Sequence, residues 1–447
     1  VVCGYSQRQG IDYERAFSAT LRSTSFRTLL AIAAGKKLKL LQYDVSNAFT
    51  QADMDDVDLF VEPPKGFEEW EIINGQRVSK LLHLRKALYG TKQASRLWQQ
   101  TLCEFLCDQF GFTKSPSDPC IFRYSDGKFE IILGVYVDDV VVAYCGDELL
   151  ERFEKEFALR FKIRNEGALR WFLGMAIDQD EKTFAITVSH ALSITKMLEK
   201  HLPGNTVTRE YPNPAVFEKL ELPKDDVERA KVEKYAYPSM VGSLLYLAVM
   251  SRPDIAYHTS VLAKHMSDPS ITTCEAAIHL MQYLAFTKDR VMVFSGKIEV
   301  PEGLEKHAED IRLNHGFVAY SDSSWGNKYP YPMFGYGIYL FGGLVTFSSK
   351  QLKVVAFSSC EAEYAAASYC CKEIEFVRNI CSDMGVILQG RLVLAVDNTA
   401  AIDIANDVGV SGRTKHFDRA IHYLRDLTQL RRVLPTFIST RLQRADG

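Results

Sequence analysis

The sequence lacks any long apolar run. None of its 447 residues fall in a stretch of about 18 uncharged apolar residues, the length of a membrane-spanning helix. No secretory signal precedes Val1, so we expect no membrane partner. The chain starts at Val1 rather than at a methionine and stops abruptly at Gly447. We therefore interpret it as a piece cut from a longer product.

Paired zinc-binding spacing is also missing. The ten cysteines and ten histidines are scattered, although Cys370 and Cys371 are adjacent and Cys103 and Cys107 are one helical turn apart. Such scatter favours buried free thiols in a reducing compartment over a disulfide framework.

An excess of either charge is absent as well. The net charge of −3 neither indicates nor excludes a nucleic-acid partner, so the local distribution matters more. Between Arg413 and Arg444 the sequence has eight basic residues against two acidic ones. This segment is a candidate phosphate-binding surface, and a solvated helix face is the alternative.

The length predicts two to four domains, because 447 residues exceed what one core supports. In the first half, apolar periodicity predicts helices at 21–35, 92–110 and 147–161, a strand at 39–45, and strand pairs at 129–145 and 171–188. A polar stretch at 203–226 predicts a linker, followed by helices at 238–250, 254–266 and 272–286.

The pattern restarts after a charged boundary at 296–312. Strands are expected at 316–321, 335–341, 344–348, 391–396 and 433–439, and helices at 360–383, 399–406 and 417–430. Three antiparallel strands, a long helix and then alternating strands and helices describe an α+β domain of about 135 residues.

Asp138 and Asp139 interrupt an apolar strand pair, in GVYVDDVVVAY. Because burying unpaired carboxylates is costly, they must lie in a solvated turn or bind a metal ion, and aspartate is a common turn residue. A third carboxylate, Asp44, ends the apolar strand in LLQYDVSNAF. Neighbouring strands that end in carboxylates can hold two Mg²⁺ ions about 3.5–4 Å apart. The turn and the metal site both remain open at this point.

Several segments together resemble known sequence blocks. YVDD is similar to the Tyr-x-Asp-Asp box of reverse transcriptases, and DVSNAF to their first palm motif. Further blocks are KALYGTKQASRLW, SDPCIF, RWFLGMAI and GSLLYLAVMSRPDIAY. Along the chain, from Tyr5 to Asp446, the blocks fall in the family's order. The chain resembles the reverse transcriptase and ribonuclease H region of copia-type LTR retrotransposon Pol polyproteins.

The resemblance implies roles for residues of the first half. Asp44 and Asp138 match the main metal ligands, and Asp139 a weaker or outer ligand. Phe49 matches the steric gate that crowds a ribose 2′-hydroxyl, with core packing as the alternative. Ser95 stands where the family has proline, which would loosen the template-side loop. The remaining matches are Gly90, Lys92, Gln93 and Tyr136 for nucleotide and template, and Phe172, Leu173 and Gly174 for primer positioning.

A second ordered set of acids resembles the four carboxylates with which ribonuclease H holds two metals. Singly, acids at strand ends and helix starts are usually turn or cap residues, and Ser358-x-x-Glu361 looks like a capping box. Glu363 is preferred to Glu361 because Ala-Glu-Tyr aligns with the family's catalytic glutamate. The set is Asp322, Glu363, Asp397 and Asp446. RTKHFD implies hybrid contacts by Arg413, Lys415 and His416, with Asp418 as an alternative ligand.

The resemblance therefore implies an α+β multidomain chain in the form of a right-hand polymerase followed by an RNase H-like domain. Fingers and palm would occupy 1–177, thumb and connection 178–312, and the RNase H-like domain 313–447. It implies two Mg²⁺ per site, with Mn²⁺ as the alternative. The implied partners are an RNA template, a DNA or tRNA primer, RNA–DNA hybrid, deoxynucleoside triphosphates and other segments of the polyprotein.

The implied location is cytoplasmic, in a virus-like particle, and nuclear at a later stage. Two alternatives stay open. The first is a decayed or truncated relic that binds nucleic acid without catalysis. The second is a non-enzymatic nucleic-acid-binding protein, which would have no need of seven acids at motif positions.

Overall fold

The computed structural model describes residues 2–54, 57–325, 331–406 and 423–445. The chain divides into two compact units: a first unit of Val1–Arg22 with Lys39–Ala168, and a second unit of Ser23–Leu38 with Leu169–Gly447. The mixed α and β architecture expected from the sequence is confirmed. The expected division at 177 and 312 stays a prediction. The compact units part after Ala168 instead and assign an early helix to the second unit.

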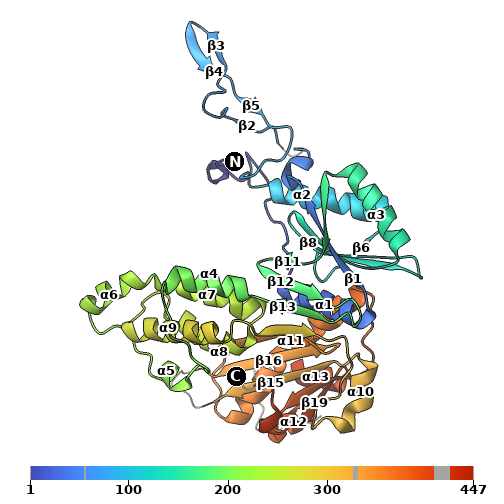
Figure 1. The fold of residues 1–447 in the computed structure, drawn as a ribbon, viewed down its shortest axis with the longest axis vertical. Coiled ribbons are helices and arrows are strands. Elements are labelled where there is room, and N and C mark those ends of the chain that lie inside the picture. Colours follow the sequence, from blue (N-terminus) through green and yellow to red (C-terminus); the bar gives the residue numbers. More distant parts are fainter. Residues whose placement is uncertain (1, 55–56, 326–330, 407–422, 446–447) are drawn as a thin grey trace. The chain divides into compact units, whose positions relative to one another are not determined.

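A six-stranded antiparallel sheet forms the centre of the first unit (Figure 1). Its order is β10 (Ile163–Ala168), β1 (Lys39–Val45), β9 (Asp139–Cys145), β8 (Glu130–Tyr136), β7 (Ile121–Ser125) and β6 (Thr113–Lys114). Strand β1 and the β8–β9 hairpin lie where the apolar runs predict them. Strand β10 was missed because its sequence, IRNEGA, is polar and largely exposed, and so lacks an apolar alternation.

Helices α2 (Ala94–Glu104) and α3 (Asp147–Arg160) pack onto this sheet around a shared aromatic core. The predicted helix 92–110 is α-helical only to Glu104 and continues as a π-helical turn over Phe105–Phe110. Phe105 stacks on Phe157 and meets Phe161 edge-on. Aromatic pairs of this kind add stabilisation beyond their burial, and they fix α2 over the hairpin strands.

Two short ribbons complete the first unit. They pair β2 (Phe60–Val61) with β5 (Leu82–His83), and β3 (Trp70–Ile73) with β4 (Gln76–Ser79). Their apolar side chains are largely exposed, which is why the periodicity of this stretch predicted no element.

The second unit contains a five-stranded sheet with strand order β17–β16–β15–β18–β19. Strands β15 (Val318–Ser324), β16 (Met333–Leu340) and β17 (Gly343–Gln351) are antiparallel, whereas β18 (Leu392–Val396) and β19 (Val433–Phe437) run parallel to β15. Each was expected from the sequence. The long helix α11 (Ser359–Asp383) packs along β15 and β16, and contacts α12 (Thr399–Asn406) and α13 (Tyr423–Gln429).

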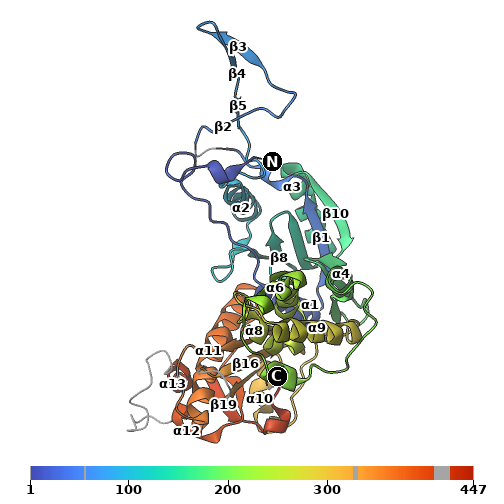
Figure 2. The same ribbon diagram turned by 90° about the vertical axis from the view of Figure 1, so that its left-hand side faces the viewer.

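The second unit also contains a group of helices from the middle of the sequence (Figure 2). They include α4 (Ala191–His201), α7 (Tyr237–Met250), α8 (Ala256–Ala263) and α9 (Ile271–Phe286), which share one apolar core. Two short helices, α5 (Pro214–Glu218) and α6 (Asp226–Val232), fall in or beside the expected linker. The boundary segment holds α10 (Ala308–Leu313).

A four-stranded antiparallel sheet accompanies these helices. Its strands are β11 (Trp171–Phe172), β12 (Met175–Gln179), β13 (Ile186–Ser189) and β14 (Val291–Phe294). The expected strand pair 171–188 supplies three of them, and the fourth, β14, comes from a distant part of the sequence.

Helix α1 (Ser23–Lys36) belongs to the second unit although its flanking segments belong to the first. It packs against β17, where the buried Arg27 donates from Nε to the Val345 carbonyl over 2.9 Å. Arg27 also donates to the Val249 and Met250 carbonyls at the end of α7. Burial lowers the pKa of Arg27 to about 10. Arginine at a helix C-terminus satisfies carbonyls that lack a partner within the helix.

Two expectations about absences can be compared with the described residues. No helix in this part of the chain is long and apolar enough to cross a membrane. All ten cysteines are free thiols, five of them buried, which agrees with the expectation of unpaired cysteines.

Two candidate carboxylate sites

The first candidate site lies on the β8–β9 hairpin. Tyr136 pairs with Asp139, which leaves Val137 and Asp138 as a two-residue turn. On the other side, Asp139 lies directly opposite Asp44 of β1. The turn interpretation thus describes Asp138, whereas Asp44 and Asp139 are strand residues that face each other. Tyr136 ends β8 half-buried.

Backbone hydrogen bonds hold this turn in place. The Trp98 indole N–H donates to the Val137 carbonyl over 2.6 Å, and the Val45 N–H donates to the Asp138 carbonyl over 2.8 Å. Val137 has φ +59°, a conformation that is uncommon for any side chain and a genuine outlier for a β-branched one. Such residues persist only where their surroundings fix them, and Trp98 and Val45 do so here.

Two of the three carboxylates at the first site contact other side chains of the sheet. Gln42 donates to Asp139 over 2.8 Å, and Arg164 forms a 3.9 Å ion pair with Asp44. Arg164 also pairs with Glu166. Burial and the charges of Asp138 and Asp44 raise the pKa of Asp139, against the hydrogen bond from Gln42 that lowers it. This arrangement crowds negative charge at the hairpin and partly offsets it with Arg164.

Phe49 and Tyr89 pack together beside these acids. Phe49 lies in a 3₁₀ turn over Ala48–Gln51, and its ring centroid is 4.5 Å from that of Tyr89. Burial and then the charge of Asp138 raise the pKa of Tyr89. Sequence reasoning missed Tyr89, although it directly precedes Gly90 in the LYGTKQ segment.

The expected nucleotide and template residues have different environments. Gly90 has φ +101°, and a Cβ there would meet the Val2 carbonyl oxygen at 2.0 Å, so only glycine fits. Gln93 is buried and bonds to Gln7 and to the Asp12 carbonyl. These two residues shape the fold of the loop. Lys92, in contrast, is exposed.

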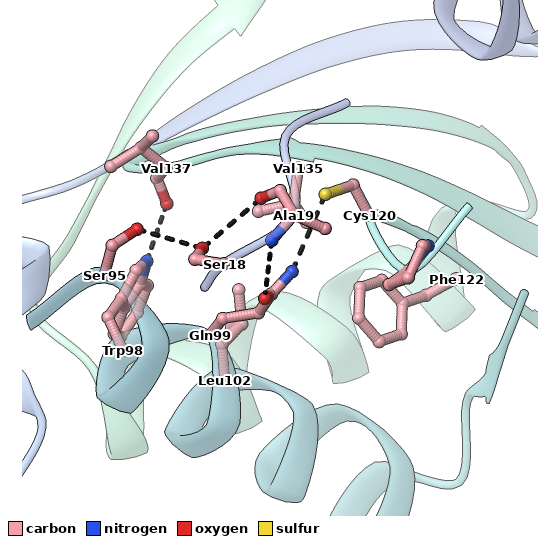
Figure 3. A pocket seen from close by; sticks show the side chains of 11 residues that line it. Ser18, Ala19, Ser95, Trp98, Gln99, Leu102, Cys120, Phe122, Val135 and Val137 are labelled. Carbon is pink, nitrogen blue, oxygen red and sulfur yellow. Dashed lines mark hydrogen bonds between the residues drawn. The ribbon is translucent and has the colours of Figure 1, made fainter. Parts of the chain in front are cut away.

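A small pocket lies behind the hairpin turn (Figure 3). Its volume is about 20 Å³, room for roughly one water molecule. Trp98 and Val137 line it, together with Ser18, Ser95 and Gln99. The Ser95 hydroxyl donates to Ser18 Oγ over 2.9 Å. Ser95 therefore gains a tie between α2 and the N-terminal segment, which opposes the loosening that loss of the family's proline would bring.

Phe172, Leu173 and Gly174 lie in the second unit, between β11 and β12. Phe172 is buried and its ring centroid is 4.7 Å from that of Phe26 in α1. Leu173 and Gly174 form the turn of the hairpin.

The second candidate site lies at the carboxyl ends of two parallel strands. Tyr320 of β15 pairs with Ala395 of β18. Asp322 and Asp397 each come two residues later: Asp322 lies two residues before the end of β15, and Asp397 directly follows β18, so the two lie side by side. In α/β sheets, ligand sites form at the carboxyl ends of strands.

Glu363 joins these aspartates from the first turns of α11. Ser358 caps the helix by accepting from the Glu361 N–H over 3.2 Å, and Glu361 accepts from the Phe357 N–H over 2.7 Å. The capping interpretation thus fits Glu361, and Glu363 is left for the cluster. Glu363 is only 5% exposed. Its Oε1 accepts from the Ser323 N–H over 2.9 Å and the Ser323 hydroxyl over 2.8 Å.

Three carboxylates converge here. One oxygen each of Asp322, Glu363 and Asp397 lies within 4.8 Å of the others, the one such acid, histidine or cysteine group among the described residues. Burial, and then the charges of Asp322 and Asp397, raise the pKa of Glu363 to about 8. Glu363 Oε2 is buried without a hydrogen-bond partner, which needs an explanation in a folded protein.

The C-terminal segment runs past the same site. The Thr440 hydroxyl donates to Asp397 Oδ2 over 2.9 Å, and Gln443 donates to the Ser321 carbonyl over 3.0 Å. A Cβ on Gly335, which pairs with Asp322, would meet the Ala445 carbonyl at 2.7 Å. Thr440 and Gln443 had no sequence motif to mark them. Five expected residues lie outside the described part of the chain: Arg413, Lys415, His416, Asp418 and Asp446.

The second cluster fits a hard divalent cation. Mg²⁺ and Mn²⁺ prefer carboxylate oxygens, and a cation would give the buried Glu363 Oε2 the partner that it lacks. It would also favour the ionised form that burial and two neighbouring charges disfavour. The first cluster offers the same ligand type, but its acids do not form so close a group in the described structure.

Comparison with known proteins gives the family context. Residues 1–213 match the family model for reverse transcriptase (RNA-dependent DNA polymerase). Over its whole length the chain is 30% identical to the retrovirus-related Pol polyprotein from transposon TNT 1-94 of Nicotiana tabacum, covering 32% of that protein. The chain is a relative of retrotransposon Pol polyproteins. The resemblance expected from the motifs is thereby confirmed.

Other relatives agree with this. The Pol polyprotein from transposon RE1 of Arabidopsis thaliana is 30% identical over the whole chain, which covers 29% of it. The putative transposon Ty5-1 protein of Saccharomyces cerevisiae is 28% identical and matches 74% of the chain and 100% of its own length. The chain spans about a third of the length of the two plant polyproteins.

One solved structure aligns with the chain at low similarity. It is the foamy viral protease-reverse transcriptase in complex with double-stranded DNA, at 13% identity and a TM-score of 0.21, covering 91% of this chain and 60% of that one.

Proposed function

We propose that this chain is an RNA-directed DNA polymerase with ribonuclease H activity, which copies retrotransposon RNA into DNA and degrades the RNA of the hybrid. The observation that carries the polymerase is the match of residues 1–213 to the reverse transcriptase family, together with Asp44 and Asp139 on adjoining strands of the first unit and Asp138 in the turn beside them. The nuclease is carried by the convergence of Asp322, Glu363 and Asp397.

In the polymerase, Asp44, Asp138 and Asp139 would hold two Mg²⁺ ions, which when bound activate the primer 3′-hydroxyl and neutralise the leaving pyrophosphate. Arg164 contacts one oxygen of Asp44 and Gln42 one oxygen of Asp139, so a metal ion would compete with them there. Phe49, backed by Tyr89, would narrow the space at the sugar. Lys92 is exposed and can reach phosphate, whereas Gly90 and Gln93 shape the loop that carries it. Tyr136 would lie against nucleotide or template.

In the nuclease, Asp322, Glu363 and Asp397 would hold the ions, with Asp446 as the proposed fourth ligand. Ser323 fixes one oxygen of Glu363 and leaves the other for the metal. Thr440 orients Asp397 in the same way, as partners of metal ligands generally do. The order of the strands, three antiparallel and then two parallel with α11 between them, supports an RNase H-like assignment for 313–447.

The remaining proposals follow from the family context. Fingers and palm would occupy 1–177 and thumb and connection 178–312, with Phe172, Leu173 and Gly174 positioning the primer end. Arg413, Lys415 and His416 would contact the hybrid, guided by its shape and its 2′-hydroxyls. The partners would be an RNA template, a DNA or tRNA primer, deoxynucleoside triphosphates, RNA–DNA hybrid and other polyprotein segments, in a cytoplasmic particle and later the nucleus.

A second candidate function has one specific observation in its favour. Arg164 pairs with Asp44, and Gln42 bonds to Asp139, so two of the three polymerase acids have protein partners. A relic that binds nucleic acid without polymerising would need no more than this. The two candidates differ in one measurable property, divalent-metal-dependent extension.

The test is a primer-extension and hybrid-cleavage assay on the 447-residue chain with Mg²⁺, Mn²⁺ or chelator. We expect extension on an RNA template and cleavage of RNA in a hybrid, both lost with chelator. Asp44→Asn should abolish extension, since a neutral amide is a poor Mg²⁺ ligand. Lys39→Gln is the matched control, because it changes a charge on the same strand in an exposed ion pair with Asp147. Template binding without extension in either metal would favour the relic.

A further inference from the structure

The turn at Leu173–Gly174 has a strained backbone. Phe172 pairs with Met175 across it, so Leu173 and Gly174 form a two-residue hairpin loop. Their φ angles are +46° and +75°, and positive values at both central positions define a type I′ turn. Glycine adopts such angles freely, whereas leucine does so at a cost. The turn therefore needs support from outside the hairpin.

Tyr246 of α7 provides that support. Its hydroxyl donates to the Leu173 carbonyl over 2.5 Å. A Cβ on Gly174 would lie 2.5 Å from the same hydroxyl oxygen, so the glycine makes room for the tyrosine. On the other side, Ser193 of α4 donates to the Gly174 carbonyl over 2.9 Å. Both carbonyls of the turn are thus held by side chains from two helices.

Behind Tyr246 lies a chain of hydrogen bonds with one possible direction. The Leu173 carbonyl can only accept, so the phenolic proton of Tyr246 points to it. His190 Nε2 is 3.1 Å from the Tyr246 oxygen and must then donate. Its Nδ1 carries no proton in the neutral ring and accepts from the Ser251 hydroxyl. The donor or acceptor role of each group thereby fixes the role of the next group in the chain.

Burial makes the inner part of this chain rigid. His190 is 2% exposed and Ser251 5%, while Tyr246 is 39% exposed. Burial and the charge of Arg252 lower the pKa of His190 to about 4, so the ring is neutral near pH 7, as the direction of the bonds requires. His190 directly precedes α4, and Ser251 directly follows α7. The network therefore locks two helix ends to one turn.

We propose that Tyr246, supported by His190 and Ser251, is a positioning residue that sets the geometry of the Leu173–Gly174 turn and thereby the placement of the primer end. This inference rests on the proposed function, because it takes that turn as the primer-positioning element. Tyr246 acts through the turn and does not touch reacting atoms. Its loss should weaken productive primer binding more than it slows turnover.

The test compares Tyr246→Phe with Tyr237→Phe. Both variants remove a hydroxyl of α7 that donates to a backbone carbonyl, that of Tyr237 donating to Leu262 over 2.9 Å. For Tyr246→Phe we expect the KM for primer–template to rise about three- to tenfold with little change in kcat, the scale of one lost hydrogen bond. Amide exchange of peptide 171–176 should also become faster. Ser251→Ala should shift both quantities in the same direction, by less.

The outcomes separate the two proposals. Equal effects of Tyr246→Phe and Tyr237→Phe would overturn the positioning role, because both would then reflect general loss of stability. An unchanged KM and unchanged exchange in Tyr246→Phe would overturn it as well. If the wild-type chain extends no primer, the proposed function fails. Amide exchange at 171–176 then still tests whether Tyr246 stabilises the turn. Faster exchange in Tyr246→Phe, but not in Tyr237→Phe, would support that role.

Discussion

Asp44 and Asp139 face each other across antiparallel strands of the first unit, whereas Asp322 and Asp397 lie near the carboxyl ends of two parallel strands of the second unit and are joined by Glu363 from a helix. In the first cluster, Arg164 and Gln42 already engage carboxylates. In the second, a buried oxygen of Glu363 has no partner. Carboxylates therefore have different surroundings in the two clusters: partners from neighbouring side chains in the first, and a buried oxygen without a partner in the second.

This difference shows how a fold can prepare acids for metal. At the hairpin, charge is balanced by neighbouring side chains, and binding a cation means exchanging partners. At the strand ends, the buried Glu363 lies beside the half-buried Asp322 and Asp397. Burial, followed by the charges of these two aspartates, raises the pKa of Glu363 and so disfavours its ionised form in the metal-free protein. The second cluster should bind metal with less rearrangement than the first.

The largest predicted effect separates the two clusters by function. Asp138→Asn should reduce primer extension at least about a hundredfold and leave hybrid cleavage intact, and Asp397→Asn should do the reverse, because each site stabilises its own transition state. Both activities are measured on each variant with the same hybrid substrate. Loss of both activities in either variant would mean that the clusters are not independent.

The next prediction concerns Glu363. Since its pKa is raised to about 8, the folded state binds this proton more tightly than the unfolded state does. In chelator, stability should therefore fall as pH rises from about 4.5 to about 8, by at most about 5 kcal/mol. Glu363→Gln should flatten that fall, as followed by denaturant midpoints at pH 5 and 8.

Added Mg²⁺ sharpens the same measurement. It should restore wild-type stability at pH 8 and have little effect on Glu363→Gln. Glu361→Gln is the matched control, since that neighbouring carboxylate caps the helix instead. A wild-type midpoint that is independent of both pH and metal would contradict the raised pKa of Glu363.

A smaller effect is expected at Phe49, which packs against Tyr89 beside the first cluster only. Phe49→Val should raise ribonucleotide incorporation relative to deoxyribonucleotide incorporation by about tenfold, because a smaller side chain leaves room for a 2′-hydroxyl. Hybrid cleavage should not change. Competition between the two nucleotide types on one template measures the ratio, and an unaltered ratio with normal extension would leave Phe49 as a core residue.

The smallest effect belongs to Ser95. Ser95→Ala should lower the free energy of unfolding by about 0.5–1.5 kcal/mol, the worth of its hydrogen bond to Ser18. Ser18→Ala should cost about as much, and the double variant no more than either, which denaturant unfolding can measure. Full additivity would show that the Ser18–Ser95 pair does not tie α2 to the N-terminal segment.

Much of the fold could be predicted from local patterns. The strands of the five-stranded sheet and the β8–β9 hairpin have apolar runs that end in turn residues, and α11 begins at the Ser358 cap. Strand β10 could not be predicted, because it is polar and pairs with β1 from far along the chain. The same holds for β14, which completes a sheet begun more than 90 residues earlier.

The sites follow the same rule. Acids within motifs were recognisable by type and order, and the structure brings Asp322, Glu363 and Asp397 together. Their supporting partners were not recognisable, since Gln42, Arg164 and Thr440 act across strands with no local spacing to mark them. Whether these acids are catalytic stays a prediction.

Helix α1 has a consequence for how the chain is made. Ten consecutive residues of the helix, Ser25–Ala34, are buried, yet its partner strand β17 spans Gly343–Gln351. A ribosome adding about 5–20 residues per second needs on the order of 15–60 s to supply that strand. Throughout that interval the nascent chain carries an apolar helix without its main partner strand. Fragments of this protein cut after residue 168 would share that exposed helix permanently, and we expect them to need chaperones or to aggregate.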